Sequence, residues 1–594
     1  MFQSFDSTTS PDTCAVRVQA LRRAMKAIAV DGFLVPRADI HQGEYVPARD
    51  ARLGWISSFT GSAGFAAVLD TRAALFVDGR YGIQARQQVD LDIYEIWKHP
   101  EQKLSEFILD GMAQGAKLAY DPWLHTIGAI EALRKELAGR VELVPVENLI
   151  DKVWQDQPPA PQGLMQVHPL EFAGLDHVQK IKDIAAALTS AGQDHMIMTQ
   201  PDNVAWLTNT RGSDLGQTPV TLCLAVLHSD ARLDLYIDEA KLTPAMHAHL
   251  GDRVSIHAIG AFARDVQRLA GVVRIDRAVA PQALADLPNA VFAPDAVTLA
   301  KARKNPSELQ GARAAHLRDG AAMATFLYWV SQNGETGLNE IQIARKLEEF
   351  RTATGQLRNI SFDTICGSGP NGAIVHYRVN EDSNRQLNSG EILLVDSGAQ
   401  YQDGTTDITR TLAIGPPPAE AVRANTLVLQ GMIAISRLRF PRGLAGRDID
   451  AIARQALWNA GLDYDHGTGH GVGSFLSVHE GPQGISRRAE VELAEGMILS
   501  NEPGYYKEGA FGIRIENLVY VTQAPEITGA DARDMLSFVT LTLAPIDRAL
   551  IDVSLLTSVE RHWLDTYHAQ VLAQIAPLVS PEVHRWLTQA CAPL

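Results

Sequence analysis

The stretch Ile392-Leu393-Leu394-Val395-Asp396-Ser397-Gly398, with Asp407-Ile408-Thr409-Arg410-Thr411-Leu412 after it, decides the fold predicted for this chain. Each is a short apolar or β-branched run next to turn residues, a pattern that predicts a buried strand. The same pattern returns in Met497-Ile498-Leu499-Ser500-Asn501 and in Ile513-Arg514-Ile515-Glu516-Asn517. Two similar groups of strands in one segment indicate an internal repeat.

Helices and polar side chains recur together with these strands. Helical patterns at about 307–332 and 339–354 precede the first group, and patterns at about 418–438 and 447–460 precede the second. Three pairs of polar residues occupy matching positions, namely His376 and His479, Asp396 and Glu502, and Asp407 and Glu516. The members of these pairs are 103, 106 and 109 residues apart. Two copies related by a pseudo-twofold axis would present these side chains to one shared cleft.

The length of 594 residues is too great for one hydrophobic core. Residues 1–155 mix helical stretches with strand candidates such as Gly32–Val35 and Ala73–Val77, which predicts an α/β domain. Residues 156–305 begin at a proline-rich linker, 157–162, and show a similar order of elements. Residues 306–594 hold the repeat. We therefore predict a fold of mixed α/β and α+β class, with two N-terminal α/β domains before a C-terminal catalytic domain.

Composition and charge argue against several classes of function. The net charge of −16 opposes binding to nucleic acid or to an anionic membrane, because both carry phosphate. Four scattered cysteines argue against a disulfide framework and against a thiolate zinc site. The first residues lack the apolar core of a secretory signal, and no apolar run reaches the length of a membrane span. We therefore expect a cytoplasmic protein that binds neither nucleic acid nor a membrane.

The carboxylates of the repeat have structural alternatives to a functional role. Asp396 and Glu502 each end an apolar strand, where an acid often caps a turn. Glu516 lies within the β-branched run from Ile513 to Val521, where a buried carboxylate must be paired or bound to a metal. Strand alternation places Arg514 on the same face, so an ion pair with Arg514 is an alternative to a metal.

The tract His466-Gly467-Thr468-Gly469-His470-Gly471-Val472-Gly473 is rich in glycine. A helix is disfavoured here, because each glycine costs about 1 kcal/mol relative to alanine within one. A strand or extended loop would place His466 and His470 on one face, and the glycines would let the backbone approach a ligand closely. An ordinary core or surface role is the alternative for either histidine alone.

Together these residues form an oxygen-rich set with one nitrogen. The candidate metal ligands are Asp396, Asp407, His470, Glu502 and Glu516. Hard divalent metals suit such ligands, so we expect Mn²⁺, with Co²⁺ and Zn²⁺ as alternatives. Four carboxylates carry more charge than one divalent ion balances, and two ions about 3.5–4 Å apart are therefore predicted. Nearby histidines that bind no metal could donate hydrogen bonds to an oxyanion.

Five motifs of this chain resemble, in order, the ligand motifs of the pita-bread metallohydrolases: Val395–Gly398, Asp407–Thr411, Gly469–Gly473, Asn501–Gly504 and Ile513–Asn517. Within that family, the chain is similar to the three-domain, cytosolic Xaa-Pro aminopeptidases. The resemblance implies a pita-bread fold for the C-terminal domain. It also implies release of the N-terminal residue from peptides with proline second, by attack of a metal-bridging hydroxide. The alternatives are a prolidase that acts on Xaa-Pro dipeptides, which usually has one N-terminal domain, and a non-catalytic binding protein, which intact ligand motifs disfavour.

The resemblance also implies a role for each candidate residue. Asp396 would bind one metal, His470 and Glu502 the other, and Asp407 and Glu516 both. The candidate catalytic residues are Glu502, as a proton acceptor, together with His376 and His479. The candidate substrate-binding residues are Arg80, His376, His466, His479, Tyr506 and Arg514.

Two further expectations come from the same resemblance. Arg80, in Asp78-Gly79-Arg80-Tyr81, would reach the substrate from a neighbouring domain, although a structural ion pair with Asp78 is an equally good explanation. The segment Leu536–Leu564 resembles an extension that supports dimer formation, so a homodimer is expected.

Overall fold

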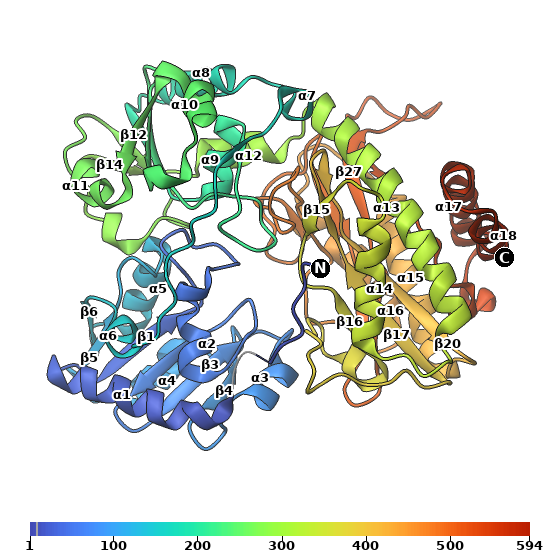
Figure 1. The fold of residues 1–594 in the computed structure, drawn as a ribbon, viewed down its shortest axis with the longest axis horizontal. Helices are drawn as coiled ribbons and strands as arrows, with labels where there is room; N and C mark the ends of the chain where they lie inside the picture. The colour runs from blue at the N-terminus through green and yellow to red at the C-terminus, as the bar shows by residue number, and fades with distance from the viewer. Residues whose placement is uncertain (8–9) are drawn as a thin grey trace. The chain divides into compact units, whose positions relative to one another are not determined.

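The computed structural model describes residues 1–7 and 10–594 (Figure 1). The described chain divides into two compact units. The C-terminal unit holds Met1–Ser7, Glu171–Gly174 and Leu299–Leu594. The N-terminal unit holds the other described residues, up to Leu170 and from Leu175 to Thr298. The predicted repeat therefore lies within one unit.

Two six-stranded sheets with the same topology form the N-terminal unit. The first has the order β4-β3-β2-β1-β5-β6, and the second has the order β12-β11-β10-β8-β13-β14. In the first sheet β3, β2 and β1 pair antiparallel, in the second β11, β10 and β8 do, and all the other neighbouring strands pair parallel. This shared pattern supports a duplicated α/β domain.

The strands of the first sheet are β1 (Gly32–Pro36), β2 (Phe65–Leu69), β3 (Ala73–Val77), β4 (Glu95–Lys98), β5 (Lys117–Tyr120) and β6 (Glu142–Pro145). Those of the second are β8 (His195–Met198), β10 (Leu224–His228), β11 (Leu233–Ile237), β12 (Val254–Ala258), β13 (Val273–Ile275) and β14 (Ala290–Phe292). Helix α1 (Cys14–Ala27) precedes the first sheet, and α8 (His177–Ser190) precedes the second. Residues 157–162, predicted as a linker, contain neither helix nor strand.

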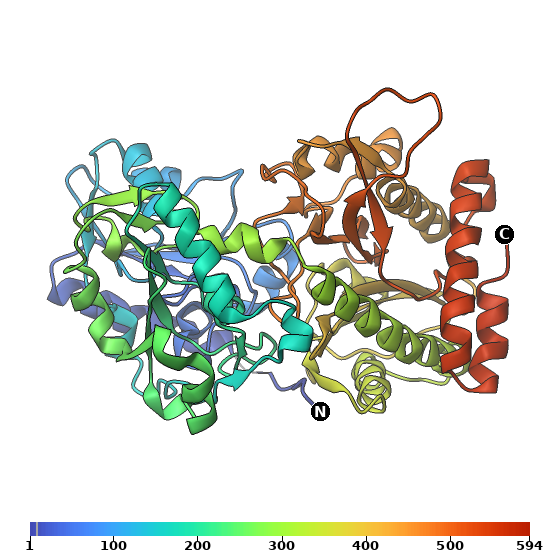
Figure 2. The same ribbon diagram turned by 90° about the horizontal axis from the view of Figure 1, so that it is seen from above.

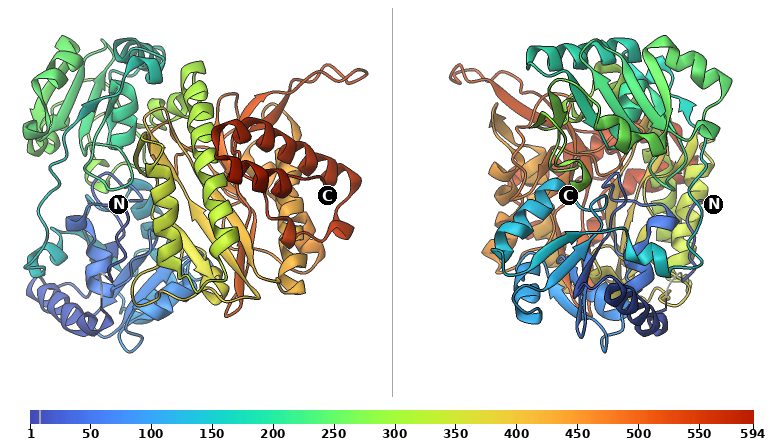
Figure 3. Two further views of the ribbon diagram at one scale, coloured as in Figure 1. Left: turned by 45° about the vertical axis from the view of Figure 1, so that its right-hand side comes forward. Right: turned by 90° about the vertical axis from the view of Figure 1, so that its left-hand side faces the viewer.

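The first half of the C-terminal unit begins with two helices, α13 (Pro306–Asn333) and α14 (Glu340–Thr352). Asn305 and Glu308 form a capping box at the start of α13, with Pro306 in its first turn. The two helices lie side by side beside the strands that follow (Figure 3). The central strands of this half are β16 (Ile365–Ser368), β17 (Glu391–Ser397) and β20 (Ile408–Ile414), which pair antiparallel in the order β16-β17-β20.

The second half repeats this order. Helices α15 (Ala419–Ser436) and α16 (Asp450–Asn459) come first. The strands that follow include β22 (Gly469–His470), β24 (Ile498–Asn501), β25 (Gly504–Lys507), β26 (Phe511–Arg514), β27 (Asn517–Gln523) and β28 (Met535–Thr540). Strands β21 (Arg439–Pro441), β28, β27 and β24 form one antiparallel sheet in that order. All four predicted helices of the repeat are confirmed.

A pair of C-terminal helices completes the unit. Helices α17 (Ser558–Ile575) and α18 (Pro581–Ala590) lie side by side and pack against α13 (Figure 2). Their apolar faces share one core with α15 and β26, which includes Leu429, Ile513, Leu564 and Leu587. Among the described residues, no helix combines the length and apolar character needed to cross a bilayer.

The strand predicted through Ile513–Val521 is wrong in one respect. The chain leaves β26 after Arg514 and enters β27 at Asn517. The backbone N–H of Glu516 donates to the carbonyl of Thr409, and that of Ile515 donates to the carbonyl of Pro503. Glu516 therefore stands between two sheets rather than within one strand.

Candidate metal centre

Strand ends bring the candidate carboxylates together. Asp396 lies near the end of β17, and Asp407 lies just before β20, which pairs with β17. Glu502 follows β24, which pairs with β27, and Glu516 directly precedes β27. Each half of the repeat thus supplies two carboxylates from one pair of antiparallel strands, as the pseudo-twofold repeat predicted.

His470 lies among these carboxylates. Its Nε2 is 3.5 Å from Asp407 Oδ2 and 3.3 Å from Glu502 Oε1. Its Nδ1 lies 2.9 Å from the carbonyl oxygen of Gly471, which can only accept a hydrogen bond. The proton of a neutral ring is therefore on Nδ1, and the Nε2 lone pair faces the carboxylates, as in a metal-binding histidine.

The ligand atoms are close enough to share cations. One ligand atom each from Asp407, His470 and Glu516 lies within 4.8 Å of the others. Asp396 Oδ1 and Glu516 Oε1 are buried, and the described residues offer neither atom a hydrogen-bond partner. Buried oxygens without donors are uncommon, and a bound cation accounts for them. The donor set therefore fits divalent ions.

The electrostatics of the cluster also favour bound cations. Burial, reinforced by the charges of Asp396 and Glu502, raises the pKa of Asp407 to about 6. Burial and the charges of Asp407 and Asp396 raise the pKa of Glu516 well above its ordinary value. Burial lowers the pKa of His470, but the hydrogen bond with Asp407 and the charge of Glu502 outweigh it and raise the pKa to about 9. Without counter-ions, these carboxylates repel one another.

Arg514 pairs with Asp396 rather than with Glu516, the partner considered from the sequence. Its Nη2 lies 2.5 Å from Asp396 Oδ2, while its Nε donates to the hydroxyl of Thr409 at 3.2 Å. Its Nη1 donates to the hydroxyl of Tyr506 at 2.6 Å, and that hydroxyl lies 2.9 Å from His466 Nε2. Three of the predicted substrate-binding residues, His466, Tyr506 and Arg514, thus form one chain that ends on a candidate ligand.

Two other predicted histidines lie in loops of the same unit. The ring of His479 packs edge-on against that of His470, with centroids 4.2 Å apart. His376 is half-buried and follows the 3-10 helix η7 (Gly369–Ala373). That helix packs closely on β26, because a Cβ at Gly512 would clash with the carbonyl of Gly372. The structure thus places His479 beside the cluster, while the role of His376 stays a prediction.

Arg80 belongs to the N-terminal unit. Its Nε lies 2.9 Å from Asp78 Oδ1 and its Nη2 lies 2.7 Å from Asp78 Oδ2. This bidentate ion pair is the structural alternative considered from the sequence. A contact between Arg80 and a substrate stays a prediction.

Several supporting side chains were not identified from the sequence. The hydroxyl of Thr409 donates to Glu516 Oε2 at 2.8 Å. The hydroxyl of Ser500 donates to Glu502 Oε1 at 2.9 Å and accepts from the backbone N–H of His470. Thr409 follows Asp407 by two positions, and Ser500 precedes Glu502 by two. Because alternate residues of a strand share a face, strand alternation could have indicated both.

Comparison with protein families gives matches along most of the chain. Metallopeptidase family M24 matches residues 310–523, and the C-terminal region of peptidase M24 matches residues 534–594. The creatinase/prolidase N-terminal domain matches residues 17–153, and a second model of that description matches residues 156–308.

Several relatives match almost the whole chain. A probable Xaa-Pro aminopeptidase P of Paracoccidioides brasiliensis (strain Pb03) is 39% identical over 612 residues, covering 97% of this chain and 99% of the relative. Another, of Laccaria bicolor, is 39% identical over 604 residues and covers 97% and 93%. The solved X-prolyl aminopeptidase of Caenorhabditis elegans, described as a cytosolic enzyme with a di-nuclear active site, has a TM-score of 0.94 at 34% identity. That match covers 98% of this chain and 100% of the other.

These similarities confirm the predicted fold class, with N-terminal domains of the creatinase type before a C-terminal pita-bread domain. A solved prolidase of Thermococcus sibiricus shares the fold at 23% identity and a TM-score of 0.50, but covers only 63% of this chain.

Proposed function

The chain belongs to metallopeptidase family M24, and we propose that it is a metal-dependent aminopeptidase that releases the N-terminal residue from peptides with proline second. One observation carries this proposal. The full-length similarity to Xaa-Pro aminopeptidases coincides with a buried cluster in which the candidate ligand atoms of Asp407, His470 and Glu516 lie within 4.8 Å. A family member that had lost its activity would not need to retain such a cluster.

We assign two divalent ions to this cluster, and we propose Mn²⁺ as the metal. The proposed ligands are Asp396, Asp407, His470, Glu502 and Glu516. Bound ions acidify a water molecule and polarise the carbonyl of the scissile bond. Oxygen-rich ligands favour Mn²⁺, and the relative from C. elegans is described as having a di-nuclear site.

Glu502 is the proposed proton acceptor. Its side chain is 17% exposed, whereas that of Asp407 is 5% exposed, so Glu502 is the more accessible to a substrate. The Ser500 hydroxyl holds one oxygen of Glu502 by a hydrogen bond at 2.9 Å. Proton transfer requires a base at a fixed position within hydrogen-bonding reach, and this contact supports such a position.

The neighbouring side chains are proposed to hold the substrate. His479, packed against His470, would donate a hydrogen bond to the carbonyl oxygen as it gains charge, with His376 as a second contact.

The rings of His466 and Tyr506 are 5.4 Å apart and edge-on, and Arg514 holds the Tyr506 hydroxyl. Proline lacks an N–H and has a fixed φ, so a shaped aromatic pocket suits it better than backbone recognition. Arg80 is proposed to contact the rest of the peptide.

The proposal is tested with metal-stripped protein and a tripeptide that has proline second. Hydrolysis should be absent after chelation, and it should return when Mn²⁺ is restored. Matched tripeptides with alanine second are the control and should remain intact. Activity that chelation leaves unchanged would contradict the proposal.

A prolidase is the alternative to separate from this activity. The same preparation is assayed with an Xaa-Pro dipeptide and with an Xaa-Pro-Yaa tripeptide. We expect the tripeptide to be cleaved with the higher kcat/KM. Cleavage of the dipeptide alone would favour the prolidase.

We further propose a cytoplasmic homodimer with three domains, at 1–155, 156–305 and 306–594. The family matches change at about residues 155 and 309, close to these boundaries. The relative from C. elegans is described as cytosolic. Sedimentation analysis tests the dimer, and limited proteolysis followed by N-terminal sequencing tests the boundaries.

A further inference from the structure

Arg410 is a buried guanidinium that the proposed reaction does not use. The residue is 1% exposed. Six oxygen atoms lie within 3.0 Å of its three side-chain nitrogens, enough to occupy all five N–H donors. None of these oxygens belongs to a carboxylate. An arginine held by neutral acceptors alone acts as a geometric clamp rather than as half of an ion pair.

On one side, Arg410 binds the backbone beside the candidate metal centre. Arg410 Nη1 donates to the backbone carbonyl of Glu516 at 2.6 Å and to that of Thr409 at 2.9 Å. Thr409 in turn bonds to the Glu516 carboxylate through its hydroxyl. Arg410 therefore fixes the backbone of one proposed ligand and of the residue that orients it.

The other half of the clamp holds the C-terminal region, residues 534–594. Arg410 Nε donates to the carbonyl of Pro545 at 3.0 Å, and Nη2 donates to the carbonyl of Ala544 at 2.8 Å. The Tyr567 hydroxyl of α17 lies 3.0 Å from Nη2 and donates to the same Ala544 carbonyl at 2.8 Å. The Tyr567 ring stacks on Trp563 with centroids 5.3 Å apart, which sets the position of the hydroxyl.

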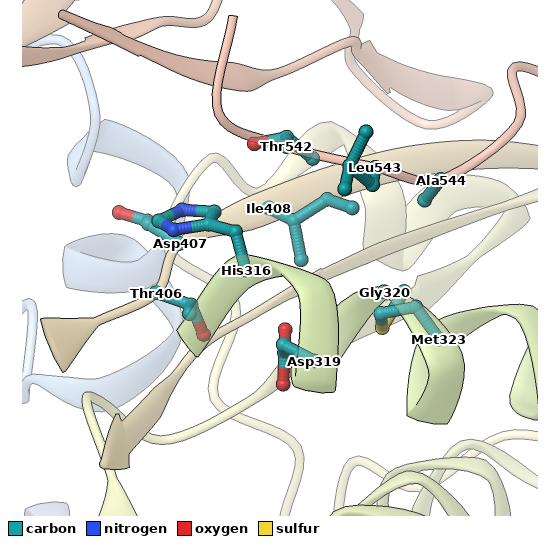
Figure 4. Close-up of a pocket in the computed structure, with 10 residues that line it drawn as sticks. All are labelled: His316, Asp319, Gly320, Met323, Thr406, Asp407, Ile408, Thr542, Leu543 and Ala544. Atoms are coloured by element: carbon teal, nitrogen blue, oxygen red, sulfur yellow. The ribbon is translucent and has the colours of Figure 1, made fainter. Parts of the chain in front are cut away.

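A second contact between the C-terminal region and the metal centre lies behind Asp407. The segment Thr542-Leu543-Ala544 lines a small cavity together with Asp407 and His316 (Figure 4). His316 is buried, and its Nδ1 lies 2.7 Å from the carbonyl of Ala312. The C-terminal region thus forms part of the wall behind a second proposed ligand.

We propose that the C-terminal region is a structural part of the metal centre, in which Tyr567 and the carbonyls of Ala544 and Pro545 position Arg410, and Arg410 positions Glu516. Arg410 and Tyr567 are positioning residues, since neither touches a metal or a substrate. Groups that orient metal ligands commonly change metal affinity by about 10- to 100-fold when removed. The inference rests on the proposed metal-binding role of Glu516.

The test compares Tyr567→Phe with Tyr328→Phe. The first removes only the hydroxyl at Arg410 and keeps the ring that stacks on Trp563. The second is a matched control, because the ring of Tyr328 on α13 lies near that of Trp586 of α18, with centroids 6.2 Å apart, and Tyr328 is not among the six acceptors of Arg410 given above. Metal-stripped full-length proteins are titrated with Mn²⁺ by calorimetry. We expect Tyr567→Phe to weaken at least one of the two binding steps about tenfold, and Tyr328→Phe to match the wild type.

Stability measurements separate positioning from a general loss of structure. A purely structural role for Tyr567 would lower the unfolding temperature of the metal-free protein and leave the affinity for Mn²⁺ unchanged, which would overturn the inference. Arg410→Lys is the second variant, because one ammonium cannot reach carbonyls on both sides, and it should weaken binding further. If the wild type binds no Mn²⁺, the proposed function fails. If the wild type binds two ions and Tyr567→Phe binds them equally well, only this inference fails.

Discussion

Asp407 illustrates how a proposed metal ligand can oppose the stability of the fold. It is buried beside Asp396, Glu502 and Glu516, and these neighbours disfavour its charged form. An uncompensated buried charge costs several kcal/mol. We therefore expect Asp407→Asn to leave the metal-free protein at least as stable as the wild type, while lowering kcat/KM at least about 100-fold.

Thermal unfolding and hydrolysis of a proline-second tripeptide, each with and without Mn²⁺, check this prediction. Asp547→Asn is a suitable control, because Asp547 is a half-buried carboxylate of the same unit that accepts hydrogen bonds from the backbone N–H groups of Ala413 and Ala549. A variant Asp407→Asn with full turnover and full metal content would contradict the assignment.

His568 should make stability depend on pH. Burial, with the charges of Arg410 and Arg548, lowers its pKa from 6.5 to about 4. Its Nε2 accepts a hydrogen bond from the backbone N–H of Ile546, which protonation would break. Between pH 6.5 and 4 the unfolded chain binds more protons at this site, so stability falls as the pH falls through that window. Between pH 7 and pH 5, the titration of His568 should lower the free energy of unfolding by about 2 kcal/mol.

Urea unfolding of the C-terminal unit at pH 7 and pH 5 measures this effect. His568→Gln keeps an acceptor near Ile546 but does not titrate, so its stability should change less between the two pH values. Equal changes in the wild type and the variant would show that other groups cause the pH dependence.

The sequence indicated Glu516 but not its exact surroundings. Its place in a β-branched run marked it as a carboxylate that needed compensation. The break between β26 and β27 depends on hydrogen bonds from Ile515 to Pro503 and from Glu516 to Thr409. Because Thr409 is more than one hundred positions away, no local pattern could reveal that break.

The loop that carries His479 is anchored by a buried ion cluster. The Glu480 carboxylate is paired with Lys304, and Lys301 Nζ lies 3.5 Å from its other oxygen. All three side chains are almost fully buried, and the Glu480 N–H donates to the carbonyl of Gly471 at 2.8 Å. The backbone bond joins the residues that follow His479 and His470, while the lysines hold the Glu480 side chain. The end of α12 (Ala296–Ala302) and the residues directly after it therefore support the proposed oxyanion contact.

We predict that Glu480→Gln lowers kcat about tenfold or more while the bound metal stays unchanged. Removal of one partner leaves buried lysines without a counter-charge, which destabilises by about 3–5 kcal/mol. Lys304→Met alone should be similarly harmful, but the double variant should be less damaging than the sum of the two. Steady-state kinetics, metal analysis and unfolding of all three variants test this coupling. Strictly additive effects would argue that the pair acts independently.

Helices were predicted more closely than the short strands. The helical pattern at about 307–332 agrees closely with α13 (Pro306–Asn333), which begins at Pro306 with Asn305 as its cap. Such signals are local, because they lie within one turn of the helix end. Strands such as β22 (Gly469–His470) are two residues long and exist only through pairing with a distant partner, β23 (Gly484–Ile485). The sequence could predict an extended conformation there, but not the pairing.

The internal repeat made the centre of the C-terminal unit predictable. Matching positions in two copies indicated which carboxylates would meet, although they lie far apart in the chain. The C-terminal region has no counterpart in the repeat, and two of its three contacts with Arg410 run through backbone carbonyls that carry no residue-specific signal. The proposed coupling between that region and the candidate metal centre could therefore be inferred only from the structure.

The division into two units predicts how metal removal should change unfolding. All the proposed ligands lie in the C-terminal unit, while the N-terminal unit has separate cores on its own sheets. A ligand stabilises only the part of the chain that binds it, by about 2.7 kcal/mol at a concentration of one hundred times Kd. Calorimetry should therefore show one transition that shifts upward with Mn²⁺ and another that does not. Asp407→Asn should abolish the shift of the first transition without changing the second. Equal shifts of both transitions in the wild type would contradict this prediction, because they would show that the two units unfold together or that both bind metal.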